Sequence, residues 1–525
     1  MLITWLTAPN EITPDLRTLM RYLAIARKGL DGELLSAVSG WSRTRCDEML
    51  THIRERRFVR IRPEDMRVFL HDEVYAWLDT FLLSGDIEHV RNNITKKFIE
   101  WYAHRANQAE TEEKRDTLCV DSLVYRLRSN PQKAYDWYAE LDDEAIRGAE
   151  IGLDMRLRTE MLGFLNSESP IDLNALPKDD QLRRLIAADT AARWVKRYMA
   201  RGQYDLPIQV GTQVFQSEKL LPTNSFFLLS RADLAVYFGQ ALIYVGRYSE
   251  GVKVLQDALN GMERKAKPEV LVEQHKGLSD SRRRNRILGR GHNNLGYSYW
   301  LDYGHLALAR KEFESARTYL EASGDIEEVA NTFDNEGRVE SELGHTNKAQ
   351  THIMMGLDKR KVRGRKYRIA LSMNSRAITF IETVPSNAIT LAKRALKECI
   401  DLGTSRGIGL CYITLGQASR AYGRNWKEDI ITPEQGEDYF LDGLEYLGLA
   451  YTIFGGSVQQ TAVRSRIPDA IVDEPVRLIE ATNEIGCTFR DRAELLRSWD
   501  PGSPDNIFTL ENAEQKAIEY LSESI

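Results

Sequence analysis

Cysteine is scarce in this chain of 525 residues, and its placement excludes two kinds of scaffold. No two cysteines form a Cys-x-x-Cys pair, and their total of five is odd. Structural zinc sites need clustered thiolates and disulfide-rich domains need paired ones, so neither is expected. The sequence instead predicts free, buried thiols in a reducing compartment, and the expected location is cytoplasmic. The five positions are Cys46, Cys119, Cys399, Cys411 and Cys487.

Long apolar runs are also missing, which argues against a membrane partner. The longest stretches, such as residues 226–229, fall far short of the ~18 consecutive apolar residues that a spanning helix requires. Residues 1–15 have no basic start and turn polar after about eight residues, which is unlike a secretory signal. We therefore expect neither a membrane segment nor a signal peptide.

Neither sign of charge dominates the composition. The 71 Lys and Arg residues and the 77 Asp and Glu residues leave a formal net charge of -6 at pH 7. Proteins that bind nucleic acid or anionic membranes through their overall field are strongly basic, so any such contact here has to be local. A hydrophobic share of 42% and only 15 prolines are typical of a globular chain rather than a disordered one.

Sequence motifs of catalysis are missing as well. No Gly-x-x-x-x-Gly-Lys-Ser/Thr string occurs, so the chain lacks the loop whose backbone amides cradle nucleotide phosphates. The nine histidines show neither His-Glu-x-x-His nor His-x-x-x-His spacing, and no nucleophile elbow occurs. We therefore expect a protein that is not an enzyme, has no metal site and holds no cofactor of its own.

The N-terminal residues combine short helical patterns with a small hairpin. Amphipathic spacing predicts three helices, the third capped by Ser42, and two β-rich stretches flank a Pro-Glu-Asp turn. Three helices followed by a two-stranded wing are typical of a winged-helix domain. The helices are expected over residues 14–28, 31–39 and 42–57, and the strands over 58–61 and 67–70.

The expected fold class is mostly all-α, in three parts. Beyond the hairpin nearly every apolar pattern is helical, and no further stretch alternates like a strand. A segment rich in Ser, Asn and Pro, residues 166–180, is typical of a linker. The predicted domains are a winged-helix unit over residues 1–82, a helical spacer over 83–175 and a repeat array over 176–525.

Small and aromatic residues recur at fixed offsets in the third part. The clearest helix pair opens with Leu295-Gly296 and Tyr299, and continues with Ala309, Phe313 and Ala316. Gly296, Gly337 and Gly416 are 41 and 79 residues apart, which indicates a period of about 40 residues. Antiparallel helices approach closely only where side chains are small, so these residues are expected to be core at helix crossings.

This spacing resembles a lengthened form of the tetratricopeptide repeat (TPR) motif, Leu-Gly-x2-Tyr followed by Ala-x3-Phe-x2-Ala. The resemblance covers roughly residues 180–525, about two-thirds of the chain. It implies an α-solenoid of six or seven helix pairs. Superhelical arrays of this class present a long concave surface, so a protein or peptide ligand is the expected partner.

Leu70-His71-Asp72, directly after the second predicted strand, matches the [M/L]HD motif of the STAND signal-transduction NTPases. Together with the repeats downstream, the chain resembles the C-terminal, regulatory portion of a bacterial member of that family. The resemblance implies that His71 and Asp72 sense ADP or ATP, but only where a nucleotide domain is supplied. The chain is then either part of a longer protein or a standalone descendant.

Two other interpretations of these residues stay open. Asp72 is also typical of a helix cap that accepts the first free backbone amides, in which case His71 has no role in nucleotide sensing. A metal or catalytic role is the third alternative.

Arginine clusters offer further candidate contacts. Seven arginines fall within residues 42–62, on the third helix and wing, where a winged helix touches DNA. Two more clusters, residues 282–290 and 359–368, open helix pairs of the array. Solvated helix faces and loops explain such clusters equally well. The candidate ligand or nucleic-acid contacts are Arg54, Arg57, Arg60, Arg283, Arg284, Arg363 and Arg365.

Three functions are compatible with these sequence features. The preferred one is a regulatory sensor scaffold that binds a protein or peptide through the repeat groove. The first alternative is a winged-helix DNA-binding regulator with a TPR sensor domain, and the second is a non-catalytic adaptor or substrate in a multi-protein bacterial defence complex.

Overall fold

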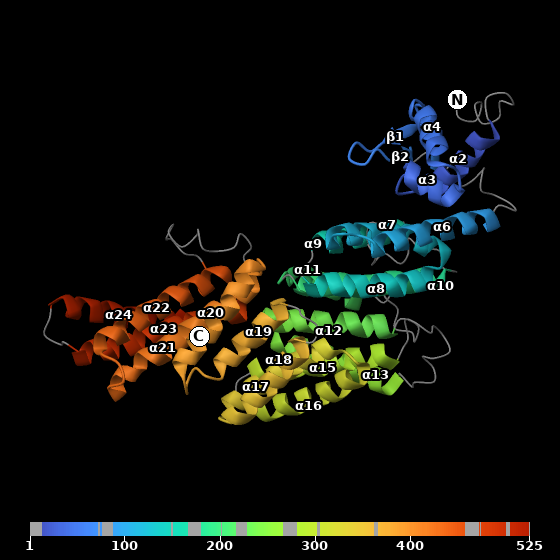
Figure 1. The fold of residues 1–525 in the computed structure, drawn as a ribbon. Coiled ribbons are helices and arrows are strands. Elements are labelled where there is room, and N and C mark those ends of the chain that lie inside the picture. Colours follow the sequence, from blue (N-terminus) through green and yellow to red (C-terminus); the bar gives the residue numbers. More distant parts are fainter. Residues whose placement is uncertain are drawn as a thin grey trace. The chain divides into compact units, whose positions relative to one another are not determined.

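The structure is a computed structural model, and contacts within it divide the chain into two compact units, Met1–Pro170 and Ile171–Ile525 (Figure 1). The predicted division into three domains stays a prediction, and we describe the two units separately. The described residues are 13–71, 74–75, 88–148, 151–165, 180–200, 202–216, 228–265, 281–301, 305–361, 366–456, 472, 474–499 and 504–523.

The N-terminal unit begins with three short helices and a hairpin, in the expected order. Side-chain oxygens of Thr13, Asp31 and Ser42 accept backbone N–H groups at the three helix starts, which stabilises each first turn. The hairpin is antiparallel, with Val59 opposite Leu70. The elements are α2 (Pro14–Ile25), α3 (Gly32–Ser39), α4 (Arg43–Arg54), β1 (Val59–Ile61) and β2 (Val68–Leu70).

Four longer helices follow within the same unit, and the first two share its core. The ring of Phe98 stacks on Tyr125 with centroids 4.9 Å apart. Arg67, beside β2, lies 3.1 Å from Asp31 and donates to the hydroxyl of Tyr102 at 3.2 Å, so it ties the hairpin to the longer helices. The helices are α6 (Glu88–Asn107), α7 (Glu112–Ser129), α8 (Pro131–Gly148) and α9 (Ile151–Leu165).

The second unit is an array of antiparallel helix pairs, and the described part contains seven. A short 3-10 helix, η3 (Arg424–Glu428), lies between the two helices of the sixth pair. The pairs are α10 (Gln181–Ala200) with α11 (Asp205–Gln216), α12 (Leu228–Tyr244) with α13 (Tyr248–Lys265), α15 (Ser281–Leu301) with α16 (Leu306–Ser323), α17 (Ile326–Glu342) with α18 (Thr346–Lys361), α19 (Lys366–Ile378) with α20 (Pro385–Asp401), α21 (Ser405–Gly423) with α22 (Pro433–Ile453), and α23 (Pro475–Trp499) with α24 (Pro504–Glu523).

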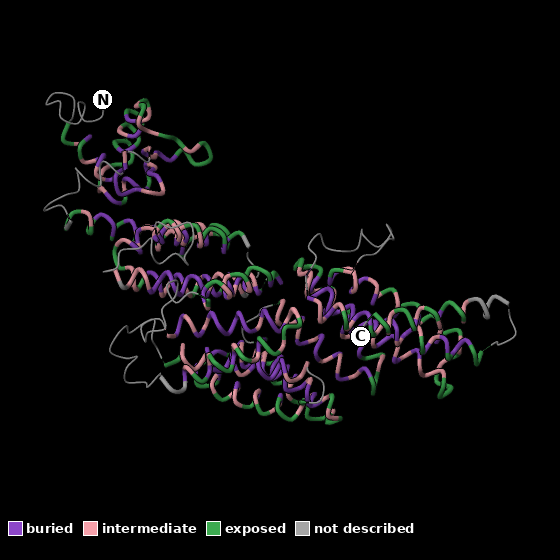
Figure 2. The backbone as a smooth tube through the Cα atoms, turned by 180° about the vertical axis from the view of Figure 1, so that it is seen from behind, coloured by how far each residue is buried: buried purple, intermediate pink, exposed green. Residues whose placement is uncertain are grey.

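The repeated small residues lie where paired helices cross, as the spacing predicts. Ala309, Phe313 and Ala316 are fully buried on α16. A Cβ atom built on Gly296 of α15 would lie only 2.7 Å from the Phe313 ring, and one on Gly416 only 2.4 Å from Leu447. Figure 2 shows the buried residues on the sides where helices of the array face one another. Close approach therefore requires glycine at these crossings.

Among the described helices, none combines the length and the apolarity that crossing a bilayer requires.

Candidate ligand surfaces

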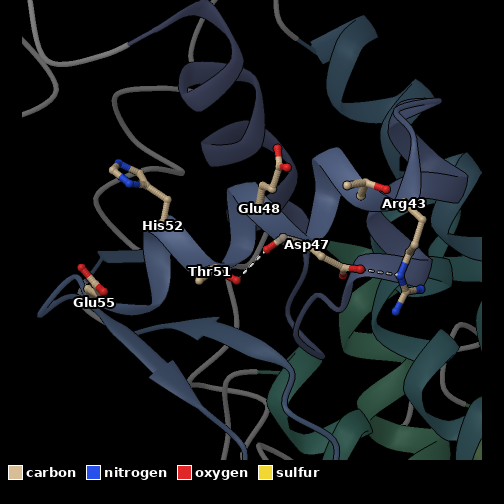
Figure 3. Close-up of a pocket in the computed structure, with 7 residues that line it drawn as sticks. Arg43, Asp47, Glu48, Thr51, His52 and Glu55 are labelled. Carbon is tan, nitrogen blue, oxygen red and sulfur yellow. Dashed lines mark hydrogen bonds and ion pairs between the residues drawn. The ribbon is translucent and has the colours of Figure 1, made fainter.

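The exposed face of α4 carries the strongest candidate for a nucleic-acid contact, yet its charge is wrong for one. A shallow hollow runs along this face (Figure 3). Its carboxylates outnumber its one arginine, and Arg43 Nε already lies 3.1 Å from Asp47 Oδ2. A phosphate backbone would meet net negative charge here. The lining residues are Arg43, Thr44, Asp47, Glu48, Thr51, His52 and Glu55.

The candidate arginines of α4 and the hairpin differ in how far they are engaged. Arg54 donates to the carbonyl oxygen of Met66 at 3.1 Å, and Arg60 Nε donates to His71 Nδ1 at 3.0 Å. Arg57 is exposed, and no ion pair joins it to another described residue. Arg57 is thus the cation of this group that is most accessible to a ligand.

Duplex DNA is therefore expected to bind the chain no tighter than about 1 μM at physiological salt, the range of non-specific binding. Any binding should fall steeply with salt, and Arg57→Ala should reduce the slope of log affinity against log salt by about one. Fluorescence anisotropy with a labelled duplex across a salt series measures both. Sequence-selective binding in the nanomolar range would instead support the DNA-binding alternative.

His71 lies at the end of β2 with a defined ring arrangement. Because a guanidinium only donates, Nδ1 accepts from Arg60, and a neutral ring then carries its proton on Nε2. The carbonyl oxygen of His71 accepts the backbone N–H groups of Val74 and Tyr75 at 2.9 and 3.1 Å. Among the described residues no hydrogen bond engages Nε2, so His71 presents one ring donor there. Asp72, its predicted partner, lies outside the described residues.

The candidate arginines of the array are less available than their clustering indicates. Arg283 is paired with Asp189 of α10 and donates to the hydroxyl of Ser230 on α12 at 3.3 Å. Arg284 is half-buried. The pairing neutralises the charge of Arg283 between helix pairs, so this residue supports packing within the array. Arg363 and Arg365 lie outside the described residues.

A buried arginine, Arg360 of α18, joins three helices of the array. It is 1% exposed, lies 3.3 Å from Glu327 and pairs with Asp334, both on α17. It also donates to the hydroxyl of Ser372 on α19. The predicted pattern of small residues did not include this group, which fixes consecutive repeats through charge.

The first helices of successive pairs form a polar and aromatic wall. Asn335 of α17 donates to the side-chain oxygen of Asn293 on α15 at 3.1 Å. Arg338 of α17 donates to the hydroxyl of Ser375 on α19 at 2.9 Å, and its guanidinium lies 5.7 Å from the ring centroid of Trp300 on α15. We call this set of five residues the first-helix wall. The amides and the hydroxyl are buried, whereas the indole of Trp300 and the guanidinium of Arg338 are partly exposed. A cation beside an indole is suited to holding a peptide.

Glu336 of α17 carries a buried carboxylate and is 2% exposed. Burial raises the pKa of Glu336 to about 7, although Arg317 Nε lies 3.2 Å from one of its oxygens and favours the charged form. Glu314 and Glu321 raise the pKa further, and His352 Nδ1 lies 3.4 Å from the other oxygen. The charged form is therefore poorly stabilised at neutral pH.

Glu336→Gln is expected to stabilise the array at pH 8 by about 1–3 kcal/mol and to change little at pH 4.5. The folded-state pKa exceeds that of the unfolded chain, so the stability that protonation contributes is complete at low pH and is lost as pH rises through about 7. Urea unfolding at pH 4.5, 6 and 8 measures the difference, and Glu494→Gln, on the exposed side of α23, is the control. A pH-independent difference would contradict this account.

Within the described ranges, no group of three or more His, Cys, Asp or Glu side chains is arranged to hold a metal ion. Whether the chain is an enzyme or takes a cofactor is not decided by that arrangement, and both absences stay predictions.

Comparison with known proteins supports the fold. No family model matches the sequence, and no curated protein matches it. A solved STAND protein with a tetratricopeptide repeat sensor, from Pyrococcus horikoshii, aligns over 98% of this chain with a TM-score of 0.54 at 11% identity. The chain spans 64% of the length of that structure. The array is therefore a TPR-like helical repeat.

A second solved structure, a Rap protein complexed with competence and sporulation factor, aligns over 75% of this chain and 100% of its own. Its identity is 13% and its TM-score 0.39, which is too low to support a shared fold.

Proposed function

We propose that the chain is the sensor and regulatory portion of a STAND-like signalling system in the cytoplasm. The array binds a protein or peptide ligand through the first-helix wall, and the N-terminal unit is a winged-helix domain that contacts a nucleotide domain. The chain itself is not an enzyme, and it meets ADP or ATP only where that domain is supplied.

The first-helix wall is the observation that carries the proposal. Its side chains come from three consecutive pairs. Trp300 of α15 and Arg338 of α17 are its partly exposed members, so an extended peptide lying across these pairs meets an indole and then a guanidinium. The acidic face of α4 favours this function over DNA recognition, because it opposes a phosphate backbone. The similarity of fold to a STAND protein with a TPR sensor agrees with the proposal.

Peptide display tests the proposed ligand surface. We expect the full chain to select binders from a random 12-residue peptide library, and Trp300→Ala to weaken a selected binder at least about tenfold, as for an aromatic hot spot. Met355→Ala, on the exposed side of α18, is the matched control and should leave affinity unchanged. Loss of binding with Met355→Ala but not with Trp300→Ala would place the ligand elsewhere and contradict the proposal.

His71→Ala tests the proposed nucleotide contact. A donor on Nε2 facing a phosphate contributes about 1.5–3 kcal/mol, so its removal should speed ADP release from a reconstituted assembly with the nucleotide domain roughly tenfold or more. Thermal melting of the isolated chain should be nearly unchanged. His89→Ala, at an exposed site on α6, is the control. If ADP release is unchanged in His71→Ala, His71 does not contact the nucleotide. If His71→Ala unfolds the isolated chain, His71 is a structural residue.

A further inference from the structure

A buried carboxylate, Glu474, lies directly before α23 among cations from distant parts of the array. It is 1% exposed. Arg406, at the start of α21, donates to both of its oxygens, with Nε at 2.8 Å and Nη2 at 3.0 Å. The hydroxyl of Tyr204, between α10 and α11, donates to it at 3.3 Å, and Arg477 Nε lies 3.4 Å away. Two guanidinium groups and a phenol thus hold one carboxylate.

This arrangement joins the beginning of the array to its end. Tyr204 and Glu474 are 270 residues apart in sequence. Arg477 also donates to the hydroxyl of Tyr297 on α15, 180 residues away. The start of α23 therefore lies against the first helices of earlier pairs, in the neighbourhood of the first-helix wall.

Three arginines and several carboxylates lie close together around this point. Arg338, Arg406 and Arg477 lie near Glu474 and Glu480, of which Glu480 pairs with Arg477. The carboxylates of Asp334 and Glu342 also act on Arg338. Among the described residues, Nε of Arg338 has no hydrogen-bond partner. Burial lowers the pKa of Arg338, and repulsion from Arg477 lowers it further. Arg338 therefore keeps one donor that no described residue takes up.

Aromatic rings flank the same cations. The Arg406 guanidinium lies 5.5 Å from the ring centroid of Tyr244, and that of Arg477 lies 5.9 Å from the ring centroid of Trp300. Burial alone would raise the pKa of Glu474, but Arg406 and Arg477 outweigh it and hold that pKa below its usual value. The site thus selects the ionised form of a carboxylate.

We propose that Arg406, Arg477 and Tyr204 form a buried carboxylate-binding site beside the first-helix wall, which Glu474 occupies as a built-in ligand. A peptide ligand supplies a carboxylate of its own, from an acidic side chain or the C-terminus, and displaces Glu474. This inference rests on the proposed peptide-binding function. Exchange of one carboxylate for another leaves the arginines paired, so displacement avoids the large cost of an unpaired buried charge.

Displacement of Glu474 also provides regulation. The contacts of Glu474 and Arg477 with Tyr204 and Tyr297 hold α23 against earlier pairs. A ligand that takes over Arg406 releases the start of α23 from Tyr204. Ligand binding thereby changes the packing between the two ends of the array, which a regulatory protein can transmit.

Chemical rescue tests the site in the full chain without any peptide. Glu474→Ala leaves the buried Arg406 without its carboxylate and Arg477 with Glu480 alone, and we expect the melting temperature to fall by roughly 5–10 °C. Added propionate should restore at least about half of this loss in a saturable manner, whereas propionamide at matched ionic strength should not. Wild-type protein and Glu494→Ala, on the exposed side of α23, should not distinguish the two additives.

The double variant Arg406→Ala with Glu474→Ala controls for a general salt effect, and it should not respond to propionate. Equal effects of propionate and propionamide on Glu474→Ala, or rescue of the double variant, would overturn the proposal.

If Glu474→Ala does not fold, Glu474→Gln replaces it, and propionate should raise its melting temperature above that in propionamide. An equal melting temperature in both additives would again overturn the proposal. A failed rescue would refute the carboxylate site and leave the proposed peptide-binding function standing. Failure of peptide selection would refute the proposed function itself.

Discussion

Replacement of Arg360 by alanine is expected to destabilise the array by about 3–5 kcal/mol, the cost of leaving buried charges without their partner. Asp334 is paired with Arg360 and buried, and Glu327 is 4% exposed at 3.3 Å from the guanidinium. Their charge would remain in a low-dielectric interior. The contacts connect α17, α18 and α19, so loosening should extend to the neighbouring pairs.

Urea unfolding of the full chain at pH 7 measures this effect. Lys361→Ala is the matched control, because Lys361 is the next residue, is 56% exposed and, within the described ranges, pairs with exposed Asp358 alone, at 3.1 Å. Exposed pairs contribute about 0–1 kcal/mol, so the control should be close to wild type. Equal unfolding midpoints for the two variants would show that Arg360 does not connect the repeats.

Gly296→Leu is expected to have the second large effect, a loss of about 3 kcal/mol or more. The Cβ atom alone would approach the Phe313 ring to 2.7 Å, and a leucine adds three further carbons at the same crossing. Phe313 is fully buried and cannot move away without opening the contact between α15 and α16.

Gly261→Leu, on α13, is the control for Gly296→Leu. An added Cβ there meets nothing within 4 Å, and leucine favours helix over glycine by up to about 1 kcal/mol. We expect this control to melt at or above the wild-type temperature. A Gly296→Leu protein that melts like wild type would contradict the assignment of Gly296 to a helix crossing.

The repeat array could be predicted because its cause is local. Gly296 and Ala316 need to be small wherever two helices cross, and the same requirement returns in each pair at nearly the same spacing. One sequence therefore contains the signal several times. The helices and hairpin before residue 71 were predictable for a similar reason, since caps such as Ser42 act on residues two or three positions away.

The carboxylate site could not be predicted, because nothing local marks it. Glu474 precedes a proline and resembles an ordinary helix start, and its partners Arg406 and Tyr204 lie 68 and 270 residues away. For Arg283 the sequence predicted a contact that the fold does not leave available. An arginine in a basic cluster indicates a cation that is free to bind a ligand, whereas Arg283 pairs with Asp189, 94 residues earlier. A charged residue in a sequence indicates which type of contact it makes, but its partner is known only from the fold.

Hydrogen–deuterium exchange with a selected peptide bound tests most directly whether the array is a ligand-binding sensor. We expect the peptide to slow exchange in the first helices α15, α17 and α19, which carry the first-helix wall, and to leave the outer helices α16, α18 and α20 unchanged. We also expect faster exchange at the start of α23, where displacement of Glu474 removes a contact. Slowed exchange confined to α4, or to α16, α18 and α20, would contradict the account.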